Sequence, residues 1–253
     1  MITLQEILDN LTYGELGHVA IGGAAMGHIE AKDYPRIVSC LNGALTAIHK
    51  RFLLRTGTVL VQQIEGQTTY YLRREFAVTN PDNPGQTKYL LDSEEDPFED
   101  NLFKVERVFN ANNAQFELNN PNISDLNPKY DKAGNIIQTA PIYTPQFDVL
   151  HLQPASPPEI VRVEYRANHP KITMSDTFDP ALIKLNIPYS ILDAISLNVA
   201  SRIYSPLTAG DGQTAAASTF AYKYELECQR LDIEGMTLDG NLSDSRFEDN
   251  GWV

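Results

Sequence analysis

Apolar residues recur every three or four positions near both ends of the chain, and every second position in the middle. The first helical stripe comprises Ile37, Leu41, Leu45, Ile48 and Phe52. With Pro35 in the first turn, this stripe predicts a helix that begins near Asp33 and stops at Gly57. Ahead of it, Thr3 and Glu6 have the spacing of a capping box, which predicts a short helix to about residue 11.

The helical period returns after Pro180. Pro188 opens a predicted helix that ends at Pro206, and its apolar stripe comprises Leu192, Ile195, Val199 and Ile203. A second helix follows the break at residues 210–212, with Ala217, Phe220, Tyr224, Cys228 and Leu231 on one face. The early stripe and these two late ones predict the core of a small bundle.

Runs rich in Val, Tyr, Phe and Thr occupy the middle of the chain, separated by turn-forming residues such as those at 80–85. The predicted strands cover residues 58–64, 68–78, 102–110, 114–118, 136–139, 147–153 and 159–167. Their alternation indicates antiparallel strands in a sandwich-like or meandering sheet. Residues 110–134 are dense in Asn, Asp and Pro, and we expect them to project from it.

These patterns predict the α+β class: a small helical bundle formed by the N- and C-terminal helices, with a large inserted antiparallel β unit. Residues 1–57 and 179–235 are the predicted helical parts, and residues 58–178 the β domain. Residues 236–253 show little periodicity, which predicts a flexible C-terminal docking tail.

Composition and charge narrow the functional classes. The 253 residues are 42% hydrophobic and 21% charged, as in ordinary globular proteins. The formal net charge of -13 opposes attraction to nucleic acid phosphates and to anionic membranes. No apolar run reaches the roughly 18 residues of a membrane span. Cys40 and Cys228 fall on apolar helix faces, which predicts reduced, structural thiols in a reducing cytoplasm.

Motifs of catalysis are missing from the sequence. Gly22, Gly23 and Gly27 have the wrong spacing for a dinucleotide turn, and His28 stands where a phosphate loop needs lysine. The histidines do not fall at metal-ligand spacing; they are His18, His28, His49, His151 and His169. No serine stands in a nucleophile elbow. We therefore expect no enzyme activity, no cofactor and no metal.

The densest acidic cluster comprises Asp92, Glu94, Glu95, Asp96, Glu99 and Asp100. It lacks the ligand order and the glycine of a calcium loop, so a solvated loop is the simplest interpretation. In a ring-shaped assembly, Glu94, Glu95 and Asp96 would instead present a negative channel wall that keeps passing DNA from adhering. A carboxylate-dependent hydrolase using Glu94 and Asp96 is the remaining alternative.

Two further segments are candidates for contacts with other proteins. The acidic tail carries large apolar side chains, as in an anchor that orders on a partner; a merely disordered end is the alternative. The residues of this hypothetical portal-docking segment are Met236, Leu238, Leu242, Phe247, Trp252 and Val253. The Asn-rich stretch supplies a hypothetical tail-contact loop, namely Asn112, Asn113, Asp131, Lys132 and Gly134.

Together these features resemble the head-to-tail adaptor (connector, or upper tail-tube) proteins of tailed bacteriophages, particularly short-tailed ones. The resemblance follows four segments in order: residues 34–54; residues 98–117, centred on Lys104, Val105, Glu106, Arg107 and Val108; residues 160–170; and residues 187–204. Its most specific part is the run Arg166, Ala167, Asn168, His169, Pro170 before the helical return.

The resemblance implies a structural virion protein of the neck, assembled in the host cytoplasm. Twelve copies would form a dodecameric ring under the portal, made by the helical bundles, with the β units reaching toward the tail or nozzle protein. The C-terminal segment would grip the portal, and DNA would pass through during ejection without sequence-specific binding. Another neck or tail ring component, such as a stopper, tail-tube or baseplate protein, is the first alternative.

Overall fold

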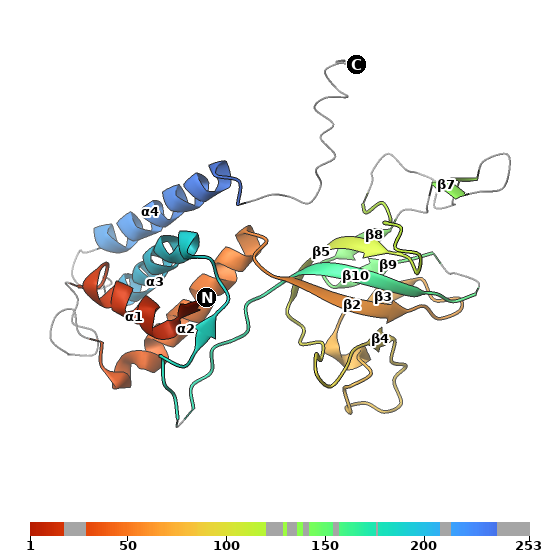
Figure 1. Cartoon of the computed structure of the whole chain (residues 1–253), viewed down its shortest axis with the longest axis horizontal. Helices are drawn as coiled ribbons and strands as arrows, with labels where there is room; N and C mark the ends of the chain where they lie inside the picture. The colour runs from red at the N-terminus through yellow and green to blue at the C-terminus, as the bar shows by residue number, and fades with distance from the viewer. Residues whose placement is uncertain are drawn as a thin grey trace, which may run out of the picture. The chain divides into compact units, whose positions relative to one another are not determined.

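The structure is a computed structural model that describes residues 1–17, 29–119, 129–130, 136–138, 142–153, 157–175, 177–207 and 214–236. The chain divides into two compact units (Figure 1). Residues 1–54 and 169–253 form the helical unit, and residues 55–168 form the β unit. This division agrees with the predicted α+β class, in which terminal helices pack together and antiparallel sheets are inserted between them; the class is confirmed.

The boundaries of the β unit differ from the predicted residues 58 and 178. Strand β2 already begins at Thr56, and residues 169–178 belong to the helical unit. Ile172 is buried in the helical core, where the Asn42 side chain binds both its backbone N–H and its C=O at 2.9 Å. The Asn42 side-chain amide thus bonds this segment as a neighbouring strand would. The hydrophobic pattern of residues 169–178 does not reveal this contact with α2.

Within the described residues, the helical unit is built from four α-helices. They are α1 (Leu4–Tyr13), α2 (Tyr34–Arg51), α3 (Leu192–Leu207) and α4 (Thr214–Ile233). The predicted capping box is confirmed, because the Thr3 side chain accepts from Glu6 N–H and the Glu6 carboxylate accepts from Thr3 N–H. The helix expected to reach Gly57 ends at Arg51 instead, since Phe52 adopts an extended backbone that leads toward β2.

The C-terminal helices begin and end slightly differently from the prediction. A short 3-10 turn, η4 (Tyr189–Ile191), precedes α3, so the α-helix starts later than Pro188. It then passes Pro206 and ends at Leu207. The α-helix thus continues one residue past the proline that was predicted to end it.

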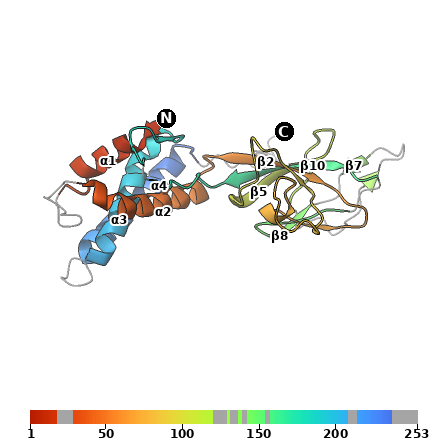
Figure 2. The ribbon, with the colours of Figure 1, turned by 90° about the horizontal axis from the view of Figure 1, so that it is seen from below.

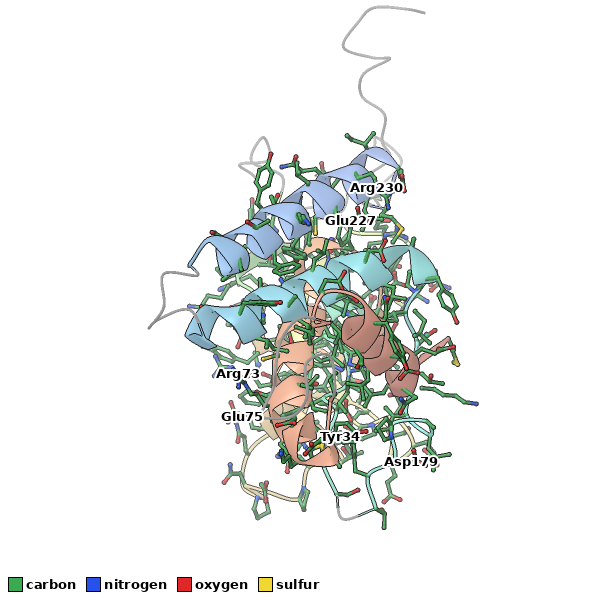
Figure 3. The ribbon with its side chains drawn as sticks, turned by 90° about the vertical axis from the view of Figure 1, so that its left-hand side faces the viewer. Tyr34, Arg73, Glu75, Asp179, Glu227 and Arg230 are labelled. Carbon is green, nitrogen blue, oxygen red and sulfur yellow. The ribbon has the colours of Figure 1, made fainter. Side chains whose placement is uncertain are left out.

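Both ends of the chain contribute to the core of the helical unit. Helix α3 packs against α1, α2 and α4 (Figures 1 and 3). Its predicted stripe is confirmed at Ile195, Val199 and Ile203, which are fully buried. Strands β1 (Ile2–Thr3) and β11 (Lys184–Leu185) pair antiparallel and join the first residues to the segment before α3.

Two antiparallel sheets dominate the β unit (Figures 1 and 2). The larger has the order β4-β2-β10-β5, and the smaller has the order β3-β9-β8. Their strands are β2 (Thr56–Gln62), β3 (Thr69–Tyr71), β4 (Leu90–Leu91), β5 (Leu102–Phe109), β8 (Tyr143–Gln146), β9 (Val149–His151) and β10 (Ile160–Ala167). Strands β6 (Lys129–Tyr130) and β7 (Ile136–Gln138) form a separate pair.

Apolar residues alternate with polar ones along the central strands, so one face of these strands lies in the core of the β unit. Val59 and Val61 of β2 lie opposite Val163 and Val161 of β10, and all are buried. Two of the predicted strands depart from the structure most clearly. The run at 68–78 ends as a strand at Tyr71 and turns through η3 (Arg74–Phe76), and the run at 114–118 forms only isolated bridges.

Candidate functional site

The acidic cluster lies in the loop between β4 and β5, and Asp92 holds this loop in place. Its carboxylate accepts from the N–H groups of Thr79 and Phe98, each at 3.0 Å, and from the Thr79 hydroxyl. Burial raises the pKa of the Asp92 carboxyl, but these donors outweigh burial and lower the pKa below its ordinary value. The loop therefore forms around an ionised Asp92.

A pocket of about 580 Å³ opens beside this loop, entirely within the β unit. Residues 55–60 line one side of it, and residues 91–93 and 96–99 line another. Asp96 belongs to this lining, but Glu94 and Glu95 do not; all three side chains are exposed. The carboxylates suggested for a hydrolase, Glu94 and Asp96, thus do not converge in the pocket.

An aromatic ring lies across β2 inside this pocket. A Cβ atom at Gly57 would stand 2.3 Å from Cζ of Tyr165, so only glycine leaves room for the ring. Phe98 packs edge-on against Tyr165, with ring centroids 5.8 Å apart. The pKa of Tyr165 is raised to about 12, chiefly by burial; Arg55 lowers the pKa, while Asp96 and Glu99 raise it. This part of the lining is therefore aromatic and uncharged near neutral pH.

Asn101 also lines the pocket, and its side-chain amide lacks one partner. Its side-chain oxygen is buried and has no hydrogen-bond partner among the described residues. Its backbone C=O accepts from Asn168 N–H at 2.7 Å, which fixes the residue at the start of β5. The charged residues of the lining are Arg55, Asp92, Asp96 and Glu99. Acids outnumber bases there, so the lining of the pocket is negative.

The edge of β2 beside the pocket is only partly covered. On this side, β4 pairs with Leu60 and Val61 alone. Gln62 N–H donates to Tyr89 C=O at 2.8 Å, so even-numbered residues of β2 direct their backbone groups away from β10. Thr56 and Thr58 share that direction, and within the described residues neither makes a backbone hydrogen bond there. Both line the pocket.

The outer face of α4 carries a second notable feature. Tyr222, Leu226 and Ile233 are spaced by four and seven residues, which places them on one stripe of the helix. All three are exposed, Ile233 to 87%. The opposite face of α4 packs inward through Cys228 and Leu231, which are fully buried. We call the three exposed side chains the outer α4 stripe.

Other exposed apolar side chains of the same unit belong to segments outside α4. Met1, Leu182 and Tyr189 are exposed by 77%, 76% and 61%. The pairing of β1 with β11 and a bond from the Tyr189 hydroxyl to Glu6 at 3.4 Å connect their segments. Figure 3 shows Arg230 of α4 at the top and Asp179, which precedes Leu182, at the bottom. We call these three side chains the N-terminal apolar surface.

Arg51 connects α2 with α4. It donates to the Glu225 carboxylate at 2.8 and 2.9 Å and to Asp232 at 2.8 and 3.3 Å. Burial lowers the pKa of the Arg51 guanidinium, but its bonds to Asp232 and Glu225 outweigh burial and raise the pKa above its ordinary value. This pair of ionic contacts holds α4 on the bundle while its outer stripe stays uncovered.

Of the hypothetical portal-docking residues, only Met236 lies within the described part of the chain. Its N–H donates to Leu231 C=O at 3.0 Å, and its side chain packs partly buried on the subunit's own core. Part of its surface is therefore already covered within the helical unit. Leu238, Leu242, Phe247, Trp252 and Val253 lie outside the described residues.

The hypothetical tail-contact loop is described at two positions. Asn112 and Asn113 are exposed in a turn in which Asn110 accepts from Asn112 N–H and Ala114 N–H, at 3.0 and 2.8 Å. Asn113 has a φ of 60°, which asparagine tolerates. Asp131, Lys132 and Gly134 lie outside the described residues.

Histidines and cysteines occupy structural positions where they are described. His49 is buried and contacts Leu45 C=O through Nδ1 at 2.8 Å, and its ring meets that of His169 edge-on. Cys40 and Cys228 are free thiols, and burial raises the pKa of both. In the described ranges, no group of three or more His, Cys, Asp or Glu side chains could hold a metal ion. None of the described helices is long and apolar enough to cross a membrane.

The pocket was not predicted from the sequence. One signal was available, because a glycine inside a strand pattern marks a close approach, and Gly57 stands at the start of β2. No protein-family model matches the chain. A search of curated proteins also finds no match.

Proposed function

We propose that this protein is a structural virion component, the head-to-tail adaptor that forms a dodecameric ring between the portal and the tail of a bacteriophage. The layout of the chain supports the proposal. Helices from both halves of the chain form one bundle, and an antiparallel β unit is inserted between them, as the resemblance implies. Twelve subunits surround a channel through which DNA passes, and Glu94, Glu95 and Asp96 face that channel.

The observation that carries the proposal is the pair of exposed apolar surfaces on the helical unit. The outer α4 stripe and the N-terminal apolar surface consist of different residues of the helical unit. Two different surfaces of one subunit make a head-to-tail contact, which generates a ring when the rotation closes. A simple two-fold dimer would need only one self-complementary surface. The proposed occupant of the stripe is therefore the N-terminal apolar surface of the next copy.

The remaining contacts of the proposal come from the sequence. Leu238, Leu242, Phe247, Trp252 and Val253 dock on the portal, while the Asn-rich loop around Asn112 and Asn113 meets the tail or nozzle protein. Large apolar side chains on an acidic segment fit a groove on a partner, since burial of aromatic anchors dominates binding energy.

Assembly on portal rings tests this function. The protein, mixed with the portal rings of the virus that encodes it, should co-sediment as a complex with a ring-shaped density. Leu226→Asp and Leu182→Asp should each stay folded, because both positions are exposed, and should each lose ring formation. Val78→Asp, an exposed apolar position in the β unit, is the matched control and should assemble normally. Normal rings from both test variants would overturn the head-to-tail model.

Partner choice separates the adaptor from its alternatives. Binding to purified tail parts without any binding to portal rings would favour a stopper, tail-tube or baseplate protein. Deleting residues 237–253 should remove portal attachment and leave the helical content intact; unchanged attachment would refute the docking role of that segment.

The hydrolase alternative receives no support from the described geometry. A pair of catalytic carboxylates needs two different environments. Glu94 is exposed outside the pocket, and the pocket's Asp92 accepts three bonds that anchor its own loop. A hydrolysis lost in the Glu94→Ala, Asp96→Ala double variant with normal assembly would revive it.

A further inference from the structure

We propose that the uncovered edge of β2 and the pocket beside it form a docking site for an extended, basic segment of another protein, which pairs with β2 as an added strand. The inference concerns the β unit alone and does not depend on the adaptor function. Its elements are the backbone of Thr56 and Thr58, the aromatic pair Tyr165 and Phe98, and the acidic side chains Asp96 and Glu99.

The backbone of β2 supplies the main-chain contacts. Thr56 and Thr58 direct their N–H and C=O groups to the pocket side, where β4 stops short of them. An exposed strand edge of this kind pairs readily with another chain, and native proteins usually protect it with a charge, a proline or a bulge. Residues 56–59 are Thr, Gly, Thr and Val, and their pairing with β10 is regular. The edge thus carries none of these protections.

The pocket supplies a place for one side chain of the added strand. In an extended peptide, alternate side chains point the same way, so one of them enters the pocket when the backbone pairs with Thr58. The apolar stem of a lysine or arginine suits the rings of Tyr165 and Phe98, and its charged end suits Asp96 and Glu99.

Charge identifies the class of the partner. The pocket holds three acids against Arg55, and Asp96 and Glu99 remain for a ligand because Asp92 serves the loop. The chain's own residues 237–253 carry four acids and one arginine, so they are repelled rather than attracted. The chain as a whole has a net charge of -13, which also disfavours most segments of a second copy. A basic segment of a different protein therefore fits best.

A synthetic peptide tests the inference on the full chain. The probe is acetyl-Val-Thr-Val-Lys-Val-Thr-Val-amide with a fluorescent label, and binding is measured by anisotropy at low salt. Replacing its lysine by glutamate should weaken binding by about tenfold or more, because a like charge would enter a negative pocket. N-methylation of alternate backbone nitrogens on the pairing edge should abolish binding, while N-methylation on the other edge should not.

Variants of the protein locate the site. Thr58→Pro removes the N–H that points to the pocket and keeps the ladder with β10, so it should abolish peptide binding, while Thr58→Val should bind as the wild type does. Independently of proline, the Asp96→Asn, Glu99→Gln double variant should lose the preference for lysine. The matched control is Glu94→Gln, Glu95→Gln, which changes the same loop outside the pocket.

Three outcomes would overturn the proposal. The first is that the lysine peptide does not bind, and the second is that the lysine and glutamate peptides bind equally well. The third is that the Thr58→Pro variant and the Asp96→Asn, Glu99→Gln variant both bind the lysine peptide as the wild type does. A peptide of residues 237–253 that binds more tightly than the lysine probe would assign the site to the chain's own tail instead. Ring formation on portals is a separate readout, so this inference can fail while the adaptor function stands.

Discussion

The two units differ in how the chain builds them. The helical core joins Ile2 near one end of the chain to Leu231 near the other, whereas the β core is contained in residues 55–168. The β unit also begins and ends at adjacent positions, because Thr56 lies opposite Arg166 and Ala167 N–H donates to Arg55 C=O at 2.9 Å. It is therefore an insertion whose two ends meet in one antiparallel pair.

This difference has consequences for folding and for association. Once the β unit folds, its neighbouring ends shorten the effective loop between α2 and α3, which lowers the entropy cost of closing the helical bundle. The exposed surfaces differ as well. The helical unit exposes apolar side chains on α4 and near the N-terminus; the β unit exposes unpaired backbone at β2 in addition to apolar side chains such as Val78. We expect side-chain packing between copies at the first and strand pairing with a basic partner at the second.

Dividing the chain at the unit boundaries should change folding more than any of the substitutions below. Residues 55–168 alone should fold and unfold cooperatively, because their core is complete. Residues 1–54 alone should lose their structure entirely, since the partners of Ile37 and Leu41 on α3 are missing. Circular dichroism with urea titration measures both. A helical, cooperatively unfolding fragment 1–54 would contradict the contrast between the units.

A charge in the helical core should have the next largest effect. Ile195→Asp places an unpaired carboxylate at a fully buried position of α3, which costs several kcal/mol and should unfold the helical unit. The β unit should keep its amide protection in hydrogen exchange. Val78→Asp at an exposed site serves as the control. Simultaneous loss of protection in both units would show that they fold as one cooperative body.

A methyl group at Gly57 should destabilise the β unit alone. Gly57→Ala forces its Cβ against the Tyr165 ring and should cost about 2 kcal/mol, as overpacking does. The urea midpoint of the isolated fragment 55–168 measures the change. Gly85→Ala, where no atom lies within 4 Å of the new Cβ, should be close to neutral. Removing the ring by Tyr165→Leu should restore part of the loss; an undisturbed Gly57→Ala fragment would disprove the steric argument.

Loss of the ionic contacts of Arg51 should affect only α4. Arg51→Met leaves the carboxylates of Glu225 and Asp232 without their shared donor, and we expect a loss of about 1 kcal/mol, since these groups are partly exposed. Amide exchange of α4 should quicken relative to α2. Arg51→Lys should recover only part of the protection, because an ammonium group cannot bind both carboxylates in a fork. Equal protection in all three proteins would assign α4 packing to Cys228 and Leu231 alone.

Acid should destabilise the β4–β5 loop, and this is the smallest of the expected effects. The pKa of Asp92 is lowered from 3.8 in the folded protein, so the carboxylate's stabilisation is fully present above that value and is lost as the pH falls through the lower folded pKa. Fragment 55–168 should lose about 1 kcal/mol or less in this window. Asp92→Asn should show a smaller loss over the same range; an equal slope in both proteins would exclude Asp92 as the cause.

Much of the fold was predictable because its signals are local. The capping box of Thr3 and Glu6, the stripe of α2 and the alternation of β10 all depend on residues within one element. Short strands escaped prediction for the opposite reason. Leu90 and Leu91 form β4 only because β2 lies beside them, and Lys184 and Leu185 form β11 only beside β1. A two-residue strand has no period of its own.

The amino-acid sequence alone determined the α+β class, the closure of a bundle by both chain ends and the location of the acidic loop, since periodicity and charge are properties of neighbouring residues. Only the tertiary structure decided that Tyr165 lies over Gly57, that β4 leaves Thr58 uncovered, and that α4 keeps an apolar stripe outside. Each of these depends on which distant segments meet, and the free energy of packing, rather than local propensity, selects that arrangement.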